Sequence, residues 1–168
     1  MGEYQRTTRA CTIESMTARL YTDLRQYIEK NELEIDPTTI LSCIETTSTK
    51  IKKGFLGGKS DVIQAGVLLT PKRLLVIAGK EDGKLGVLDA PLREIQATDY
   101  EKYDFYKLIP DNGVTISGLR TGDAGTGSVF IGLGPEDSAE QFRSQLKEAI
   151  AKANIVDFLP EKTPGHLI

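Results

Sequence analysis

A cluster of lysines is the feature of this 168-residue sequence that most directly suggests ligand chemistry. Lys50, Lys52, Lys53 and Lys59 all lie in residues 50–59, which we call the basic loop, and no acidic residue lies among them. Ammonium groups gathered on one short segment can bind an anion such as a phosphate. Because runs of like charge usually need no partner, a solvated lysine-rich turn is the simpler interpretation.

Glycines in the same segment invite comparison with nucleotide-binding loops. Residues 54–60 read Gly-Phe-Leu-Gly-Gly-Lys-Ser, which is similar to a phosphate-binding P-loop. The spacing is one residue short, and Lys53 stands where the first glycine is required. A strand pattern follows, instead of the helix whose N-terminus would bind the phosphate. A second glycine-rich run, residues 122–127, lacks the strand-helix-strand unit of a dinucleotide site. We therefore expect no nucleotide cofactor.

Residues 99–106 combine tyrosines with acidic side chains. Tyr100, Tyr103 and Tyr106 fit the half-buried edge of a strand, where aromatic side chains are favoured. If they are functional, contact with a protein partner is their natural use, because tyrosine offers a large surface and a polar tip. The carboxylates of this run could divide acid and base roles, or hold a metal, only if their environments separate their pKa values. These carboxylates belong to Asp99, Glu101 and Asp104.

Other catalytic side chains are scarce. His166 is the only histidine and lies two residues from the last residue, which does not suit a multi-histidine metal site or a catalytic dyad. Cys11 and Cys43 are far apart in the sequence and form neither a disulfide framework nor a C-x-x-C site. We expect them to be reduced, half-buried thiols. The sequence therefore predicts a non-enzymatic protein without a metal or a cofactor.

The composition is that of an ordinary globular protein, with 39% hydrophobic residues, 27% charged residues and a net charge of -3. An acidic balance argues against general binding to the backbone of nucleic acid. The N-terminal residues lack a secretory signal, and no window approaches the roughly 18 apolar residues of a membrane-spanning helix. We expect a cytoplasmic protein that binds no nucleic acid, with peripheral contact to a membrane as an open alternative.

Two helices are predicted near the N-terminus. Apolar side chains at spacings of three and four predict an amphipathic helix over residues 12–31, whose apolar face packs on its own domain or on another chain. An Asp-Pro pair at residues 36–37 indicates the start of a second, short helix. The apolar positions of the first helix are Ile13, Met16, Leu20, Leu24, Tyr27 and Ile28, and those of the second are Ile40, Leu41 and Ile44.

Beyond residue 46, short apolar runs separated by Gly, Pro, Asn and Asp are typical of an antiparallel meander. Residues 61–69 alternate as expected of a strand with one face in the core, whereas the continuous run 74–77 suggests burial on both faces. An amphipathic helix is predicted over residues 134–153, with Phe142 and Leu146 on its apolar face. The predicted strands are 47–53, 61–69, 74–79, 84–89, 95–99, 104–109, 114–119 and 128–133.

This arrangement resembles the pleckstrin-homology-like (PH-like) superfold, especially the bacterial PH-like and GRAM-type domains. The likeness lies in Gly-Val-Leu-Leu-Thr-Pro-Lys-Arg-Leu-Leu-Val at 66–76, Pro-Leu-Arg-Glu-Ile at 91–95 and Glu-Gln-Phe at 140–142. It implies an α+β fold in which a strongly bent antiparallel barrel of seven to eight strands is capped by a C-terminal helix. The PH-like domain would span residues 47–154, between an N-terminal helical extension over 1–46 and a tail over 155–168. The chain lacks the tryptophan that the terminal helix of eukaryotic members usually carries.

The resemblance also implies where a ligand would bind. In PH-like folds the loop between the first two strands binds anionic head groups, which here suggests Lys53 and Lys59, joined by Lys72 and Arg73. Phe55-Leu56 at the loop tip could contact a membrane or a partner. The predicted strand that follows, residues 61–69, has no Arg or Lys to complete an anion-binding site.

Two functions from different classes therefore remain open. The leading hypothesis is a non-enzymatic PH-like module that binds a protein partner or assembles with itself. The alternative is peripheral binding of anionic lipid head groups through the basic loop.

Overall fold

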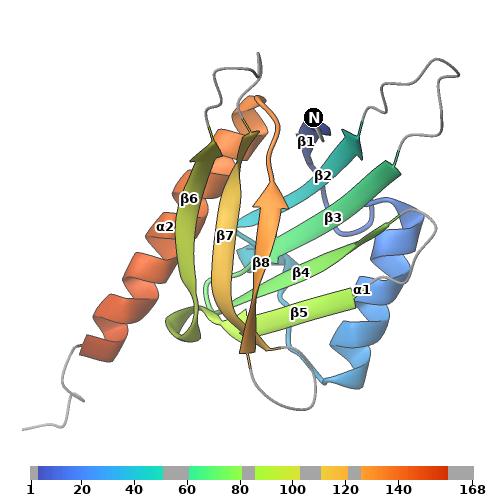
Figure 1. Ribbon diagram of the computed structural model, residues 1–168. Helices are drawn as coiled ribbons and strands as arrows, with labels where there is room; N and C mark the ends of the chain where they lie inside the picture. Colours follow the sequence, from blue (N-terminus) through green and yellow to red (C-terminus); the bar gives the residue numbers. More distant parts are fainter. Residues whose placement is uncertain (1–3, 51–60, 81–85, 103–110, 121–125, 159–168) are drawn as a thin grey trace, which may run out of the picture.

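Eight strands form one antiparallel sheet that curls strongly into a half-barrel (Figure 1). The computed structural model describes residues 4–50, 61–80, 86–102, 111–120 and 126–158. Within them the molecule is an α+β protein, in which one helix caps the half-barrel and another covers its outer face. The strands are β1 (Tyr4–Ala10), β2 (Ser42–Lys50), β3 (Asp61–Leu69), β4 (Arg73–Lys80), β5 (Gly86–Pro91), β6 (Gln96–Lys102), β7 (Asp111–Arg120) and β8 (Thr126–Gly132). The helices are α1 (Ala18–Lys30) and α2 (Asp137–Phe158), with short 3-10 helices η1 (Pro37–Thr39) and η2 (Leu92–Glu94).

The sheet bends where β5 meets β7. Strands β1 to β5 pair in sequence order, and β7 pairs with β6 and β8, but among the described residues β5 joins β7 only through the pair Asp89 and Arg120. A break in the register of β7 near Gly118, which has a φ of +90°, lies beside this junction. A β-carbon at Gly118 would lie 2.2 Å from the carbonyl oxygen of Glu94, so only glycine fits. The β6–β8 group can therefore fold across the first five strands (Figure 1).

Helix α2 closes the concave side of the half-barrel. Phe142 and Leu146 are fully buried in a core with alternate residues of β3 and β4, such as Val67 and Val76. Alternation along a strand sends every second side chain to the same face, which explains why these residues meet the helix. The structure thus confirms that the predicted C-terminal helix caps a bent antiparallel sheet.

Helix α1 covers the opposite, convex face. Leu20 and Leu24 are buried against Leu68 and Leu75, which lie between the residues of β3 and β4 that face α2. The continuous apolar run in β4 is therefore buried on both faces, as the sequence predicts. The apolar stripe of α1 packs within its own chain, which resolves the alternative left open above.

The structure corrects the sequence-based assignment before residue 47. Residues 4–10 form a strand that pairs with β2 along its length, and the predicted helix 12–31 begins only at residue 18. The predicted second helix is correct only as η1, because β2 begins at residue 42 instead of 47. Pairing with strands on both sides satisfies the backbone of β2, and this tertiary gain outweighs local helical signals. The predicted strand 104–109 lies outside the described residues.

Candidate functional site

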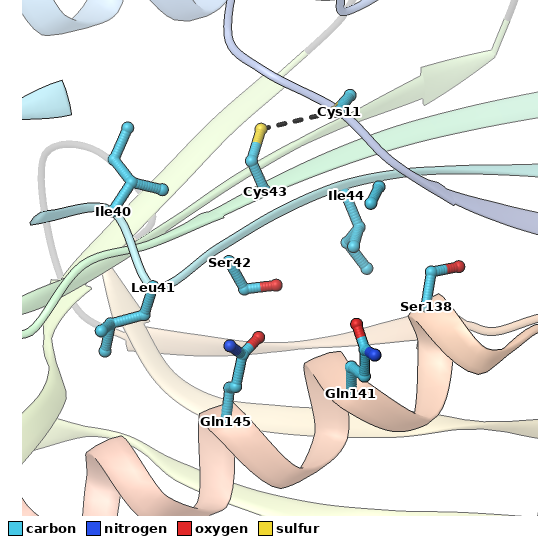
Figure 2. Close-up of a pocket in the computed structure, with 10 residues that line it drawn as sticks. Cys11, Ile40, Leu41, Ser42, Cys43, Ile44, Ser138, Gln141 and Gln145 are labelled. Atoms are coloured by element: carbon cyan, nitrogen blue, oxygen red, sulfur yellow. Dashed lines mark hydrogen bonds between the residues drawn. The ribbon is translucent and has the colours of Figure 1, made fainter. Parts of the chain in front are cut away.

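The candidate site is a groove between the start of β2 and the N-terminal half of α2 (Figure 2). Its volume is about 270 Å³, and we call it the β2–α2 groove. The lining residues come from the end of β1, the start of β2 and one face of α2. They are Ala10, Cys11, Ile40, Leu41, Ser42, Cys43, Ile44, Ser138, Gln141 and Gln145.

Helix α2 contributes three uncharged polar side chains. Ser138, Gln141 and Gln145 are three and four residues apart, which places them on one helical face, and Figure 2 shows them directed toward β2. The Ser138 hydroxyl donates a 2.8 Å hydrogen bond to the carbonyl oxygen of Thr8. Both glutamines are exposed. Their carboxamides offer donors and acceptors to a bound molecule.

The β2 side combines an exposed apolar side chain with a fixed backbone. The side chain of Leu41 is 39% exposed, which is unusual among the large hydrophobic residues of the described chain. Its backbone N–H donates a 2.8 Å hydrogen bond to the carbonyl oxygen of Leu69, so the position is held by the sheet. Asp36 accepts hydrogen bonds from the backbone and hydroxyl of Thr38, which lower the pKa of this carboxyl. This cap holds the turn that leads into β2.

Along the outer edge of β1, the backbone of Thr8 is hydrogen-bonded to other parts of the chain, whereas the backbone of Ala10 is exposed. At Thr8, the backbone N–H donates to the Glu136 carboxylate at 3.0 Å, and the carbonyl oxygen accepts from Ser138. Cys11 donates its backbone N–H to the carbonyl oxygen of Cys43 at 3.0 Å. Because hydrogen-bonded pairs alternate in an antiparallel ladder, the N–H and C=O of Ala10 point away from β2. An exposed backbone edge therefore borders the groove at Ala10.

The electrostatic character of the groove is neutral, because none of its lining residues is Asp, Glu, Lys, Arg or His. An ionic ligand would lose its hydration there without gaining a counter-charge. Hydroxyl, carboxamide and backbone groups can instead satisfy the alternating donors and acceptors of an extended peptide. The groove suits a neutral, extended ligand with a small apolar side chain that contacts Leu41.

A buried polar network lies at another place in the fold, between α1 and β5. The carboxylate of Asp89 accepts hydrogen bonds from the hydroxyl of Tyr27 and from the guanidinium of Arg73. Burial, together with this hydrogen bond, raises the pKa of Tyr27 to about 12. The charges of Asp89 and Arg73 compensate one another, as a buried ion pair requires. The hydrogen bond from Tyr27 links this pair to α1, so the network joins the helix to the sheet.

Among the described residues, the structure separates Lys50 from Lys72 and Arg73, three of the residues predicted to bind an anion. Lys72 and Arg73 lie at the end of β3 opposite to Asp61, and Lys50 is the register partner of Asp61. Nine residues of extended strand span about 30 Å, so one head group cannot contact both ends. Lys72 is exposed, whereas Arg73 is half-buried in its ion pair with Asp89.

Most of the other predicted contact residues are not described. Lys52, Lys53 and Lys59 lie outside the described residues, as do Phe55 and Leu56. The same holds for Tyr103 and Tyr106. The backbone of Tyr100 lies in β6 opposite Gly113 of β7. No sequence pattern indicates the β2–α2 groove, because exposed Ser and Gln residues on a helix are common and become a site only when a strand lies opposite.

The described part of the chain adds two general findings. No group of three or more His, Cys, Asp or Glu side chains there could hold a metal ion. Its helices are too short or too polar to cross a membrane. Comparison with protein-family models, with curated proteins and with solved structures found no significant match.

Proposed function

We propose that this chain is a non-enzymatic PH-like interaction module that binds an extended, uncharged segment of a protein partner in the β2–α2 groove. The capped half-barrel supports the PH-like comparison, because the sheet and its terminal helix occupy the relation that the resemblance implies. The observation that carries the proposal is the exposed backbone edge of Ala10 beside a neutral groove. An added strand would pair with this edge and place a side chain against Leu41.

Selection from a random peptide library displayed on phage, with the full chain as bait, tests the proposal. Selected peptides should share an extended, uncharged core. Their binding should shift the amide cross-peaks of Ala10, Leu41 and Gln145 in NMR spectra of the protein. Enrichment of strongly charged peptides, or shifts confined to other faces, would contradict it.

Substitution at the backbone edge gives a sharper test. Ala10→Pro removes the N–H that points away from β2 and leaves the ladder with β2 intact, so it should weaken peptide binding about fivefold or more. Gln145→Arg should weaken binding by placing a bulky charge in the groove. Ser144→Arg, on the adjacent exposed position of α2, is the matched control and should bind normally.

Self-assembly is the variant of this proposal in which the added strand comes from a second copy. Light scattering of the full chain over a range of concentrations distinguishes the two. A concentration-dependent dimer that Ala10→Pro abolishes assigns the groove to a second copy, whereas a monomer leaves a different protein as the partner.

The alternative function, binding of anionic head groups, rests on the lysines of the basic loop. Co-sedimentation with phosphatidylcholine vesicles, with and without phosphatidylserine, tests it directly. Charge reversal at Lys53 and Lys59 should abolish binding that depends on phosphatidylserine. Lys72→Glu is the control, because this lysine lies at the far end of β3.

A further inference from the structure

The two cysteines of the chain contact each other in the folded protein. Cys11 follows β1 and Cys43 lies in β2, and their Sγ atoms are 3.4 Å apart (Figure 2). Both are free thiols. Their positions in the sequence do not indicate this contact, because only the pairing of β1 with β2 brings them together.

The pairing of the two strands places the cysteines at a backbone position that a disulfide can span. Cys11 and Cys43 lie opposite each other and are joined by a backbone hydrogen bond, next to the register pair of Ala10 and Ile44. Such positions place the Cα atoms about 5.5 Å apart, inside the range that disulfides span. The sulfur atoms need to approach by only about 1.4 Å to reach bonding distance. Side-chain rotation can supply this movement without a change in register.

The two thiols differ in access and in environment. Both cysteines line the β2–α2 groove, but Cys11 is half-buried, whereas Cys43 is only 8% exposed and packs in the cluster beneath α1. A hydrogen bond from Cys43, helped by the positive charge of Arg9, lowers the pKa of Cys11. The hydrogen bond with Cys11, together with burial, raises the pKa of Cys43. Cys11 is thus the more accessible and the more readily ionised of the two thiols.

We propose that Cys11 and Cys43 form an oxidisable dithiol site, in which Cys11 attacks a hydroperoxide and Cys43 resolves the product to a disulfide. The inference is independent of the proposed peptide-binding function, because it needs only the pairing of the two strands.

The chemistry proceeds in two balanced steps. The Cys11 thiolate attacks one oxygen of the hydroperoxide, the O–O bond breaks, and the departing alkoxide takes a proton to become an alcohol. Cys11 is then a sulfenic acid. The Cys43 sulfur attacks the Cys11 sulfur, the S–O bond breaks, and the departing hydroxyl leaves as water with the Cys43 proton. The two thiols lose two electrons in total, and the hydroperoxide gains them.

Hydrogen peroxide and the full chain are sufficient to test the proposal. Peptide mapping without reduction should show one intramolecular Cys11–Cys43 disulfide that dithiothreitol reverses. Because the fold holds the sulfur atoms together, disulfide formation should be about tenfold or more faster than in the urea-unfolded chain. Formation of intermolecular disulfides alone, or equal rates in the folded and unfolded chain, would overturn the proposal.

Two variants assign the roles of the cysteines. Cys43→Ala should stop at the Cys11 sulfenic acid, which dimedone traps, and Cys11→Ala should leave the buried Cys43 unreactive to peroxide. Circular dichroism establishes that each variant is folded. If Cys43→Ala does not fold, the order of alkylation in the wild-type chain replaces it: limiting iodoacetamide should label Cys11 before Cys43. Labelling in the reverse order, or dimedone capture on Cys43 in Cys11→Ala, contradicts the assignment.

Discussion

Glu45 connects α1 to the sheet, and its replacement tests how the helix is held. The side chain is only 5% exposed, and its carboxylate accepts a 2.7 Å hydrogen bond from the backbone N–H of Thr17 and another from the Thr17 hydroxyl. Arg9, whose side chain is 50% exposed, donates a third at 3.1 Å. Thr17 is the residue that precedes the first turn of α1, so Glu45 supplies a cap from a distant strand.

The expected loss of stability on replacing Glu45 follows from these three contacts. A hydrogen bond to a charged group contributes about 1.5–3 kcal/mol, but contacts that share one carboxylate are not additive. The half-exposed pair with Arg9 adds at most about 1 kcal/mol. Glu45→Ala should therefore lower the free energy of unfolding by about 3 kcal/mol. Glu45→Gln retains an acceptor and should lose about half as much.

Urea denaturation followed by far-UV circular dichroism measures this effect, since the chain has no tryptophan for fluorescence. Hydrogen exchange should also show faster exchange at the start of α1 in Glu45→Ala. Glu29→Ala is the matched control, because Glu29 is 65% exposed in its i,i+4 pair with Arg25 and should contribute about 0.5 kcal/mol or less. A loss below about 1 kcal/mol for Glu45→Ala, or one equal to that of the control, would refute the reasoning.

Three further changes test the core, the polar network and the bend of the sheet by the same denaturation assay. Phe142→Ala should cost about 3–5 kcal/mol, because it leaves a cavity where α2 caps the half-barrel; a cost below 1 kcal/mol contradicts this. The pKa of Tyr27, raised to about 12 in the folded chain and about 10 when unfolded, means that the unfolded state releases this proton first. Stability from this group is complete below pH 10 and declines from there to about pH 12, so the advantage of the wild type over Tyr27→Phe should shrink in that window; a constant difference counts against it. Gly118→Ala should cost about 2 kcal/mol or more because of its positive φ and the nearby carbonyl oxygen of Glu94, whereas Gly86→Ala, which meets no atom within 4 Å, should change stability by less than about 1 kcal/mol.

Local pattern predicts well where one segment carries its own signal. The alternation of residues 61–69 matches β3 at both ends, and the stripe containing Phe142 and Leu146 identifies the face of α2 that enters the core. Both signals are periodic, and burial of one face is the only way for such a segment to hide its apolar side chains. The prediction of a bent antiparallel sheet with a capping helix follows from these elements.

Local pattern fails where pairing decides the outcome. Residues 4–10 and 42–46 lack the regular alternation of apolar and polar side chains that indicates a strand. They become strands because β2 lies between β1 and β3 and can bond to both. The start of β2 is also the wall of the β2–α2 groove, so an error in the strand boundary hides the candidate site.

The sequence by itself predicted the antiparallel strands from β3 onward and the two amphipathic helices, because the periods of two and of 3.6 residues are properties of a single segment. It also places four lysines within residues 50–59, and an anion site there stays a prediction. Only the tertiary structure decided that Cys11 meets Cys43, that Lys72 is distant from Lys50, and that the carboxamides of α2 face the start of β2. Each of these relations joins residues that are far apart in the sequence, and strand register and helix docking, rather than local propensity, determine such distances.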